Sequence, residues 1–382
     1  MSRTRGVVDA AGAFAQRAAR DARFALGLAR RRPFQLLLQI TNRCNMTCDF
    51  CDFWPNGVPP AQELTVADYQ RLAGELDGLG TFLVSVEGGE PLVRKDLLDI
   101  LRAFARRHVV VLYSNGWFMT EELARRIYET GVAQVGISID YADAARHDAR
   151  RGQAGATERA WRAVEHLRRA APAGGRAVHV MTVLMDDNHR ELPRLLAQSA
   201  EAGVGHWITL VSAAGYRRGA GAALPSRPVS AELLRLRARF PHFRVFRDYV
   251  AAIDDFLDSA GALVGREQVQ HRDPGDGDDG DVTVPSIETN ISRARLPTCH
   301  AGTQSFNIDH VGGVAPCIEH IDWTAGNVRD EPLATILARM RDDPRIAGCQ
   351  ACWTVCRGFA QVLGDGGRRT AWTDLATRMR SW

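Results

Sequence analysis

Short apolar runs alternate with longer amphipathic segments between residues 34 and 215 of the chain. The short runs are rich in β-branched residues and predict strands, whereas the longer segments repeat apolar residues every three to four positions and predict helices. Strands are expected at Gln35 to Thr41, Phe82 to Glu87, Val109 to Ser114, Gln134 to Asp140, Ala177 to Leu184 and His206 to Val211. Helices are expected at Val66 to Leu79, Lys95 to Arg107, Thr120 to Thr130, Thr157 to Ala170 and Arg190 to Ala202. The alternation predicts an α/β fold built on a parallel sheet.

Six strand-helix repeats are two short of a closed eight-stranded barrel, so the pattern predicts an open, partial (β/α)6 TIM-like barrel. In such folds the functional loops follow the carboxyl ends of the strands. We expect an N-terminal segment at 1–33, the barrel at 34–215, a linker region at 216–296 and a smaller C-terminal domain at 297–382. The linker contains predicted helices at Ser230 to Arg239 and Tyr249 to Leu263. Its acidic loop at Arg272 to Asp281 lacks the terminal Glu of a calcium-binding loop and is interpreted as a solvated turn.

The first 33 residues combine arginines with apolar residues in the pattern of a basic amphipathic helix. Such a helix either contacts a membrane surface or packs its apolar stripe on the protein, and we favour packing because most surface helices are amphipathic. The chain lacks the roughly 18 consecutive apolar residues of a transmembrane helix. The run Phe24 to Ala29 is too short and too late for a signal peptide. These features predict a cytoplasmic protein.

Charge and composition exclude only a few classes of protein and partner. The 382 residues include 48 basic and 45 acidic side chains, which gives a formal net charge of +3. Because the two signs nearly balance, no nucleic-acid partner is expected. Hydrophobic residues make up 45% of the chain and charged residues 24%, as in an ordinary globular protein.

The eight cysteines fall into two groups, with none between residues 51 and 299. In a cytosolic protein this clustering indicates metal or redox chemistry rather than disulfides. The early group, Cys44, Cys48 and Cys51, has the spacing C-x3-C-x2-C and directly follows the first predicted strand. Three thiolates would leave one iron of a four-iron cluster open to an outside molecule. The alternative is a structural zinc knuckle, which would need a fourth Cys or His close by, and none follows Cys51 closely.

With this cysteine spacing the sequence resembles the radical S-adenosylmethionine (radical SAM) superfamily. The resemblance implies a 4Fe-4S cluster on the three early cysteines, whose open iron binds the methionine part of S-adenosylmethionine. It also implies cofactor-binding residues at the strand ends: Phe50 near the adenine, Gly88, Gly89, Glu90 and Pro91 at the ammonium group, and Ser114, Asn115, Ser138 and Asp140 facing the ribose and the substrate. Taken alone, these short motifs also fit core packing, tight turns and a helix cap.

The late cysteines resemble the SPASM and twitch extensions of the same superfamily, which bind auxiliary iron-sulfur clusters. They are Cys299, Cys317, Cys349, Cys352 and Cys356, and the first two flank a predicted hairpin. Five thiols suffice for one four-iron cluster, so we expect a single auxiliary 4Fe-4S cluster on the first four. Cys356 either replaces one of these metal ligands or is free, and a free thiol at the site would be a catalytic hydrogen-atom donor. A zinc ribbon is the alternative. The nearby His300, His310 and His320 are interpreted as ordinary hairpin residues. The alternative is an approach to the cluster or the substrate, which is easiest to maintain for His300 because it follows an expected ligand.

The resemblance implies an enzyme that takes an electron from a donor such as flavodoxin or ferredoxin. It then cleaves S-adenosylmethionine reductively to a 5'-deoxyadenosyl radical, which abstracts hydrogen from the substrate. With one auxiliary cluster, we expect an oxidoreductase or epimerase that dehydrogenates or epimerises a small polar natural product such as a sugar or aminocyclitol. The alternative is a maturase that crosslinks or otherwise modifies a ribosomally made peptide, although the 33 residues before the barrel are too few for a fused peptide-recognition domain. A zinc-stabilised binding protein is the non-enzymatic alternative.

Overall fold

The computed structural model describes residues 18–172, 177–212, 219–260, 299–320, 323–341, 343–346, 349 and 352–364. Six parallel strands form the barrel wall, and each pairs with its neighbours in chain order. They are β1 (Gln35–Thr41), β2 (Leu83–Gly88), β3 (Val109–Ser114), β4 (Gln134–Ser138), β5 (Val178–Leu184) and β6 (Gly205–Leu210). The predicted strands agree with these bounds to within two residues. The partial α/β barrel is therefore confirmed.

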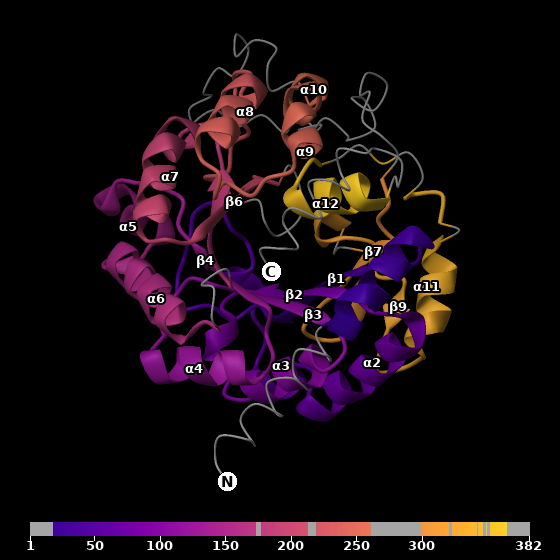
Figure 1. Ribbon diagram of the computed structural model, residues 1–382. Helices are drawn as coiled ribbons and strands as arrows, with labels where there is room; N and C mark the ends of the chain where they lie inside the picture. The colour runs from indigo at the N-terminus through magenta and orange to yellow at the C-terminus, as the bar shows by residue number, and fades with distance from the viewer. Residues whose placement is uncertain are drawn as a thin grey trace, which may run out of the picture.

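Helices surround the strands on the outside of the barrel (Figure 1). The predicted ones are present as α2 (Val66–Leu79), α3 (Leu97–Ala105), α4 (Glu121–Glu129), α6 (Ala156–Ala170) and α7 (Leu192–Glu201). Several begin at side chains that cap backbone amides: Thr65 accepts from Asp68 N and Thr120 from Leu123 N. A further helix, α5 (Ala144–Arg151), was not predicted, because the residues it buries are His147 and Arg151 rather than an apolar stripe.

The late hairpin extends the sheet beyond β1. Strand β7 (Ser305–Ile308) pairs with β1 in parallel, and β8 (Gly313–Ala315) and β9 (Gly326–Asn327) continue the sheet in antiparallel pairing. The order β6-β5-β4-β3-β2-β1-β7-β8-β9 makes one nine-stranded sheet. Helix α11 (Leu333–Arg341) packs against α2 and β9 on the outside. This pairing places the late cysteines beside the barrel.

Alternate residues of the barrel strands face the helices and the interior. In β2, Val84 and Val86 belong to the main apolar core under the helices, whereas Leu83, Ser85 and Glu87 line the cavity inside the barrel. This period of two is the normal pattern of a strand with two different faces. The inward positions thus supply the residues of the candidate site.

A second apolar core closes the barrel at its amino end and along its open side. Residues 18–29 form a helix whose Phe24 and Leu28 are buried with Phe34 and Leu83 at the amino ends of the strands. The helix therefore packs on the protein body, as favoured above; residues 1–17 lie outside the described part of the chain. Helix α12 (Val355–Gly364), yellow in Figure 1, packs against β6 and α9 (Arg247–Ala251) in the same core.

The expected linker contributes α8 (Ser230–Arg239) and two short helices to this second core. Up to residue 260, the prediction of one helix from Tyr249 to Leu263 is wrong, because the backbone departs from helical geometry at Ala252, with φ −93° and ψ 1°. The result is α9 followed by α10 (Ile253–Ser259). Residues 261–263 lie outside the described part of the chain. The acidic loop at 272–281 lies outside the described residues, and the domain boundaries remain predictions.

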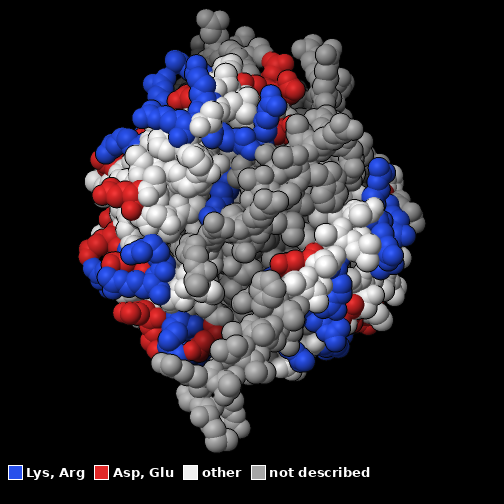
Figure 2. All heavy atoms as spheres, viewed as in Figure 1, with Lys and Arg blue, Asp and Glu red and all other residues white. Residues whose placement is uncertain are grey.

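Acidic and basic side chains are interspersed on the described part of the face in Figure 2. On α4 and α6 many of them form ion pairs along one helix, such as Arg125 with Glu122 and Arg162 with Glu158. Such exposed pairs contribute little to stability. In the part of the chain that the structure describes, no helix has the length and apolar character needed to cross a membrane.

Candidate active site

One cavity begins at the carboxyl ends of the strands and continues down into the barrel. Its upper part is lined by the loop after β1, including Cys44, Cys48 and Phe50. Its lower part is lined by Gln35 and Gln134, which lie at the amino ends of β1 and β4. The cavity therefore spans most of the length of the barrel.

The structure brings most of the predicted site residues to this cavity. The residues that line it are Cys44, Cys48, Phe50, Cys51, Gly88, Gly89, Ser114, Asn115, Ser138 and Cys356. Glu90 and Asp140 are fully buried beside it, and Pro91, which is also buried, begins a short turn, Pro91–Val93. Strand ends far apart in sequence thus converge as the barrel topology requires.

Gly88 and Gly89 allow the end of β2 to approach the cysteine loop closely. A Cβ atom at Gly88 would lie 2.0 Å from the carbonyl oxygen of Thr41, and one at Gly89 would lie 2.3 Å from that of Arg43. The backbone amides of Gly89 and Glu90 donate to the same two carbonyls, at 2.7 and 2.9 Å. A side chain at either glycine would displace the loop that carries the three early cysteines.

Glu90 connects the ends of β2 and β3. Its carboxylate accepts hydrogen bonds from the Ser114 hydroxyl at 2.9 Å and from the backbone amides of Asn115 and Leu92 at 2.7 and 2.9 Å. Burial raises the pKa of this carboxyl to about 7 against the opposing effect of these donors. Glu90 therefore holds Ser114 and Asn115 at the cavity wall, and contact between its carboxylate and a cofactor ammonium stays a prediction.

The early thiols form no disulfide, and their residues are buried or partly buried. Burial raises the pKa of Cys44 to about 12, and it also raises the pKa of Cys48, where the nearby Arg151 guanidinium opposes the effect. The Arg151 guanidinium lies 3.9 Å from the Cys48 sulfur, and the Met46 amide lies 3.4 Å from the Cys44 sulfur. Such thiols are protonated unless a bound metal removes the proton.

Arg151 was missed by the sequence analysis. It lies at the end of α5 and donates to the carboxylate of Asp140, whose other oxygen accepts from the Val183 amide at 2.8 Å. Asp140, predicted to face the cofactor or substrate, thus pairs with an arginine behind Cys48. The pair of arginines in the sequence is the only local signal, and it does not distinguish a buried guanidinium from a surface one.

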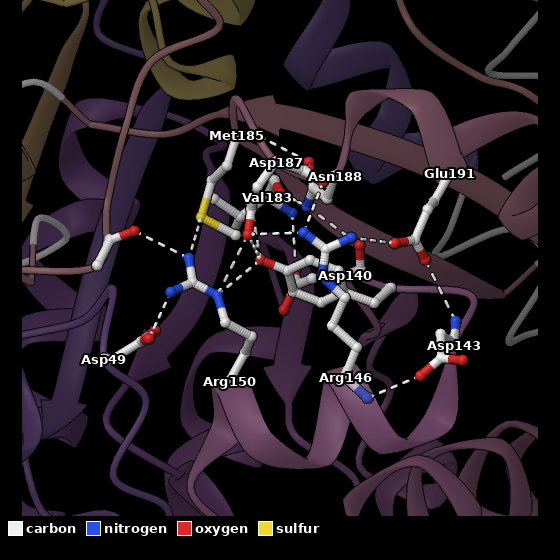
Figure 3. Close-up of polar contacts among 12 residues, drawn as sticks. Asp49, Asp140, Asp143, Arg146, Arg150, Val183, Met185, Asp187, Asn188 and Glu191 are labelled. Carbon is white, nitrogen blue, oxygen red and sulfur yellow. Dashed lines mark hydrogen bonds and ion pairs between the residues drawn. The ribbon is translucent and has the colours of Figure 1, made fainter.

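The neighbouring Arg150 connects the cysteine loop to the loops that follow β4, β5 and β6 (Figure 3). Its guanidinium contacts the Asp49 carboxylate and donates to the Tyr141 hydroxyl at 2.8 Å and to the Gly221 carbonyl at 2.8 Å. The guanidinium carbons of Arg150 and Arg151 lie 5.7 and 5.3 Å from the ring centre of Phe50. These cation–π contacts fix the ring that the resemblance places near the adenine.

The late cysteines line a second cavity beside β1. Cys299, Cys317, Cys349, Cys352 and Cys356 all contribute to it, together with Glu319. Burial raises the pKa of Cys299, and raises those of Cys317 and Cys352 well above the ordinary value. Cys356 lines both cavities and packs with Cys51 around Phe53 and Ile318. It therefore lies between the early and the late thiols.

The three histidines near the late cysteines have separate environments. His300 lines the second cavity, whereas His310 is buried near Leu64, whose amide donates to the His310 carbonyl. The side chain of His320 is outside the described part of the structure. Of the two described side chains, that of His300 lies where it could approach a group held by the late thiols.

The two zinc alternatives, a knuckle at the early cysteines and a ribbon at the late ones, both require closely spaced ligands. Thiolates on one zinc ion must lie close together, because each Zn–S bond is about 2.3 Å long. Among the described residues, no three Cys, His, Asp or Glu side chains gather closely enough to hold one metal ion. A four-iron cluster instead takes one thiolate at each iron. Three cysteines line the first cavity at the loop after β1 and five line the second, numbers that suffice for the cluster ligands that the resemblance implies.

Comparison with known proteins identifies the family. Residues 38–198 match the model of the radical SAM superfamily. The chain contains a radical SAM domain. Residues 299–353 match the SPASM iron-sulfur cluster-binding domain, which covers the hairpin and four of the late cysteines. Both predicted family assignments are thus confirmed. These families bind 4Fe-4S clusters and S-adenosylmethionine, and this chain has cysteines in both regions.

Similar radical SAM proteins cover most of the chain. The AdoMet-dependent heme synthase of Methanosarcina barkeri is 26% identical over 349 residues, 85% of this chain and 90% of that protein. The mycofactocin maturase MftC of Mycobacterium ulcerans is 28% identical over 343 residues, 85% of this chain and 82% of that protein. SuiB of Streptococcus suis, solved with S-adenosylmethionine, has the same fold, with a TM-score of 0.55, 15% identity, and coverage of 82% of this chain and 67% of SuiB.

Proposed function

We propose that this radical SAM enzyme is a maturase that modifies a peptide inside its barrel cavity. The depth of the cavity supports this substrate class. From Ser138 near the cysteines to Gln134 at the floor, β4 runs four residues, or about 13 Å at 3.3 Å per residue. A segment of extended chain reaches over that length, whereas a single sugar ring does not.

The relatives support the same class. A mycofactocin maturase aligns over 85% of this chain, and a structure of SuiB with its precursor peptide SuiA shows that the shared fold can take a peptide in that protein. The expectation of a sugar or aminocyclitol rested on the number of late thiols. The comparisons therefore favour the peptide alternative over that first expectation.

Heme-type chemistry is the second candidate, because a heme synthase is among the relatives. A tetrapyrrole substrate carries carboxylates, which need cationic partners when buried. Of the arginines and lysines in the described structure, only Arg151 lines the cavity, and it is paired with Asp140. The cavity charge thus favours an uncharged substrate segment over a tetrapyrrole.

The positions of the cysteines in the two cavities support an assignment of the cofactor ligands. Cys44, Cys48 and Cys51 would ligate the 4Fe-4S cluster, and Cys299, Cys317, Cys349 and Cys352 the auxiliary one. A donor such as flavodoxin or ferredoxin would reduce the cluster on the early cysteines. S-adenosylmethionine bound there would then supply the 5'-deoxyadenosyl radical that abstracts hydrogen from the substrate.

The remaining side chains would position and shield these groups. Phe50, Gly88, Gly89, Ser114, Asn115 and Ser138 would contact S-adenosylmethionine from the cavity wall. Glu90 would orient Ser114 and Asn115 through its hydrogen bonds, and Asp140 would act through Arg151. Cys356, between the two cavities, would be the hydrogen-atom donor if it ligates no cluster.

The test is product formation by the anaerobically reconstituted enzyme with dithionite and S-adenosylmethionine. Short peptides encoded beside the gene, a panel of aminocyclitols and a carboxylated porphyrin are offered separately, and 5'-deoxyadenosine and substrate mass are followed by mass spectrometry. We expect one peptide to stimulate 5'-deoxyadenosine formation and to change mass, with no product from the triple variant of Cys44, Cys48 and Cys51 to Ala. Stimulation by an aminocyclitol or the porphyrin, with every peptide inert, would overturn the proposal.

A further inference from the structure

Three polar side chains lie at the floor of the barrel cavity, far from the cysteines. They are Gln35 on β1, Gln134 on β4 and His179 on β5, and each is at most 3% exposed. All three line the same cavity that begins at Cys44. Small apolar side chains would fill such a floor without any hydrogen-bonding requirement, so polar residues here need an explanation.

The floor residues have polar atoms that the protein itself does not satisfy. The Gln35 Oε1 atom, the Gln134 Nε2 atom and both ring nitrogens of His179 are buried without a hydrogen-bond partner among the described residues. Native structures pair the great majority of buried polar atoms, because an unpaired one retains the penalty of leaving water. A water molecule or a substrate group in the cavity can supply the missing partners.

The backbone opposite His179 is shaped to admit its ring. A Cβ atom at Gly136 would lie 2.5 Å from His179 Nε2 and 2.7 Å from a ring carbon of Tyr113. The His179 and Tyr113 rings meet edge to face with their centres 5.7 Å apart. Burial lowers the pKa of His179 to about 3, so the imidazole is neutral at ordinary pH and offers one donor and one acceptor.

We propose that Gln35, Gln134 and His179 form a subsite for an uncharged amide group of the substrate. The Gln134 amide would donate to the carbonyl oxygen of that group, and Gln35 Oε1 would accept from its N–H. The neutral imidazole would satisfy the remaining donor or acceptor. This inference rests on the proposed function, because a peptide brings such groups in its backbone and in Asn or Gln side chains.

Charged groups fit the floor less well. Arg151 is the one arginine or lysine among the described lining residues, and it lies beside Cys48 rather than at the floor. Arg244 does not line the cavity but is close enough to lower the pKa of His179, so a carboxylate enters the test as well. Glu87 also lines the cavity, near the carboxyl end of β2, so an ammonium group is the competing occupant and enters the test directly.

The first experiment compares stability with substrate use. His179→Leu removes two unpartnered ring nitrogens and no hydrogen bond present in the described structure, so its melting temperature should not fall below that of the wild type. Its KM for the peptide should rise about fivefold, the usual effect of losing one neutral hydrogen bond. Gln134→Met should behave in the same way. A lowered melting temperature with unchanged KM would assign these residues to structure and overturn the subsite.

A matched control lies on the same strand as Gln35. Gln39 is buried, donates to Asn307 Oδ1 at 3.1 Å, and is not among the residues that line the cavity. Gln39→Met should lower the melting temperature, because it leaves the Asn307 oxygen unpaired, and should leave KM for the peptide unchanged.

The second experiment uses probes that do not depend on turnover. Saturation-transfer NMR of the reconstituted protein with S-adenosylmethionine is recorded with N-methylacetamide, acetamide, acetate and methylammonium. We expect saturation transfer to N-methylacetamide and to acetamide, and we expect this transfer to be lost in Gln134→Met. Transfer to N-methylacetamide alone would indicate that the subsite binds a backbone amide, and transfer to acetamide alone would indicate that it binds a side-chain amide. Binding of acetate or methylammonium instead, or of no probe at all, would overturn the inference. Amide binding without any peptide turnover would leave the subsite standing and refute the proposed function.

Discussion

Arg151 and Asp140 form an ion pair inside the protein, with side-chain exposures of 10% and 0%. The pair connects the end of α5 to the loop after β4 and places a guanidinium 3.9 Å from the Cys48 sulfur. A buried charge of this kind is stable only while its partner remains. The pair is therefore a structural requirement of the loop that surrounds the early thiols.

Asp140→Asn should destabilise the protein strongly. The substitution leaves the Arg151 guanidinium buried without a counter-charge, and breaking such a pair typically lowers the free energy of unfolding by about 3 kcal/mol or more. The double variant Asp140→Leu with Arg151→Met should recover most of this loss, because it removes both charges. Urea unfolding under anaerobic conditions measures the free energy of unfolding of the single and the double variant. A single variant as stable as the wild type would show that the pair is not formed.

The stability of the protein should fall as the pH is lowered below about 6.5. His206 is buried between the Thr182 and Ser199 hydroxyls, at 3.1 and 3.0 Å, and burial lowers its pKa to about 3. Between about pH 3 and pH 6.5, this histidine binds a proton in the unfolded chain but not in the folded protein. Unfolding therefore becomes more favourable as the pH falls through this range. The contribution of one such histidine approaches about 1.4 kcal/mol per pH unit.

Replacing His206 isolates this contribution. His206→Asn keeps a hydrogen-bonding side chain and removes the titrating group, so the free energy of unfolding should change less between pH 5 and pH 6.5 than in the wild type. Denaturation at several pH values gives the slopes. Identical slopes for the two proteins would contradict the role of His206, whatever the absolute stability of the variant.

Cys356 should be dispensable for iron binding. If Cys299, Cys317, Cys349 and Cys352 hold the auxiliary cluster, Cys356→Ala keeps the iron content of the wild type, whereas Cys352→Ala loses about four irons. Iron and labile sulfide are measured after anaerobic reconstitution. Loss of about four irons from Cys356→Ala would make Cys356 a cluster ligand and would remove it as a hydrogen-atom donor.

The sequence was sufficient for features that depend on local pattern. The strands and most helices were predicted nearly to the residue, because apolar periodicity and caps such as Thr65 and Thr120 act within one element. The cysteine spacings likewise identified both parts of the site. Helix α5 was missed because it buries charged and polar side chains instead of an apolar stripe.

Features that depend on contacts between distant segments could not be predicted. The pairing of β7 with β1 joins residues about 270 positions apart, and no local pattern specifies it. The burial of Arg151 depends on Asp140 being placed to receive it, and the unpaired atoms at Gln134 and His179 become visible only once the barrel interior is known.

The central claim is that the early and late thiols hold separate four-iron clusters. Its most direct test is the iron and labile sulfide content of the anaerobically reconstituted protein, compared with the triple variant of Cys44, Cys48 and Cys51 to Ala. The account predicts about eight irons per wild-type chain and about four in the variant. About four irons in the wild type with none in the variant would restrict iron to the early thiols, and a wild type without iron would contradict the claim altogether.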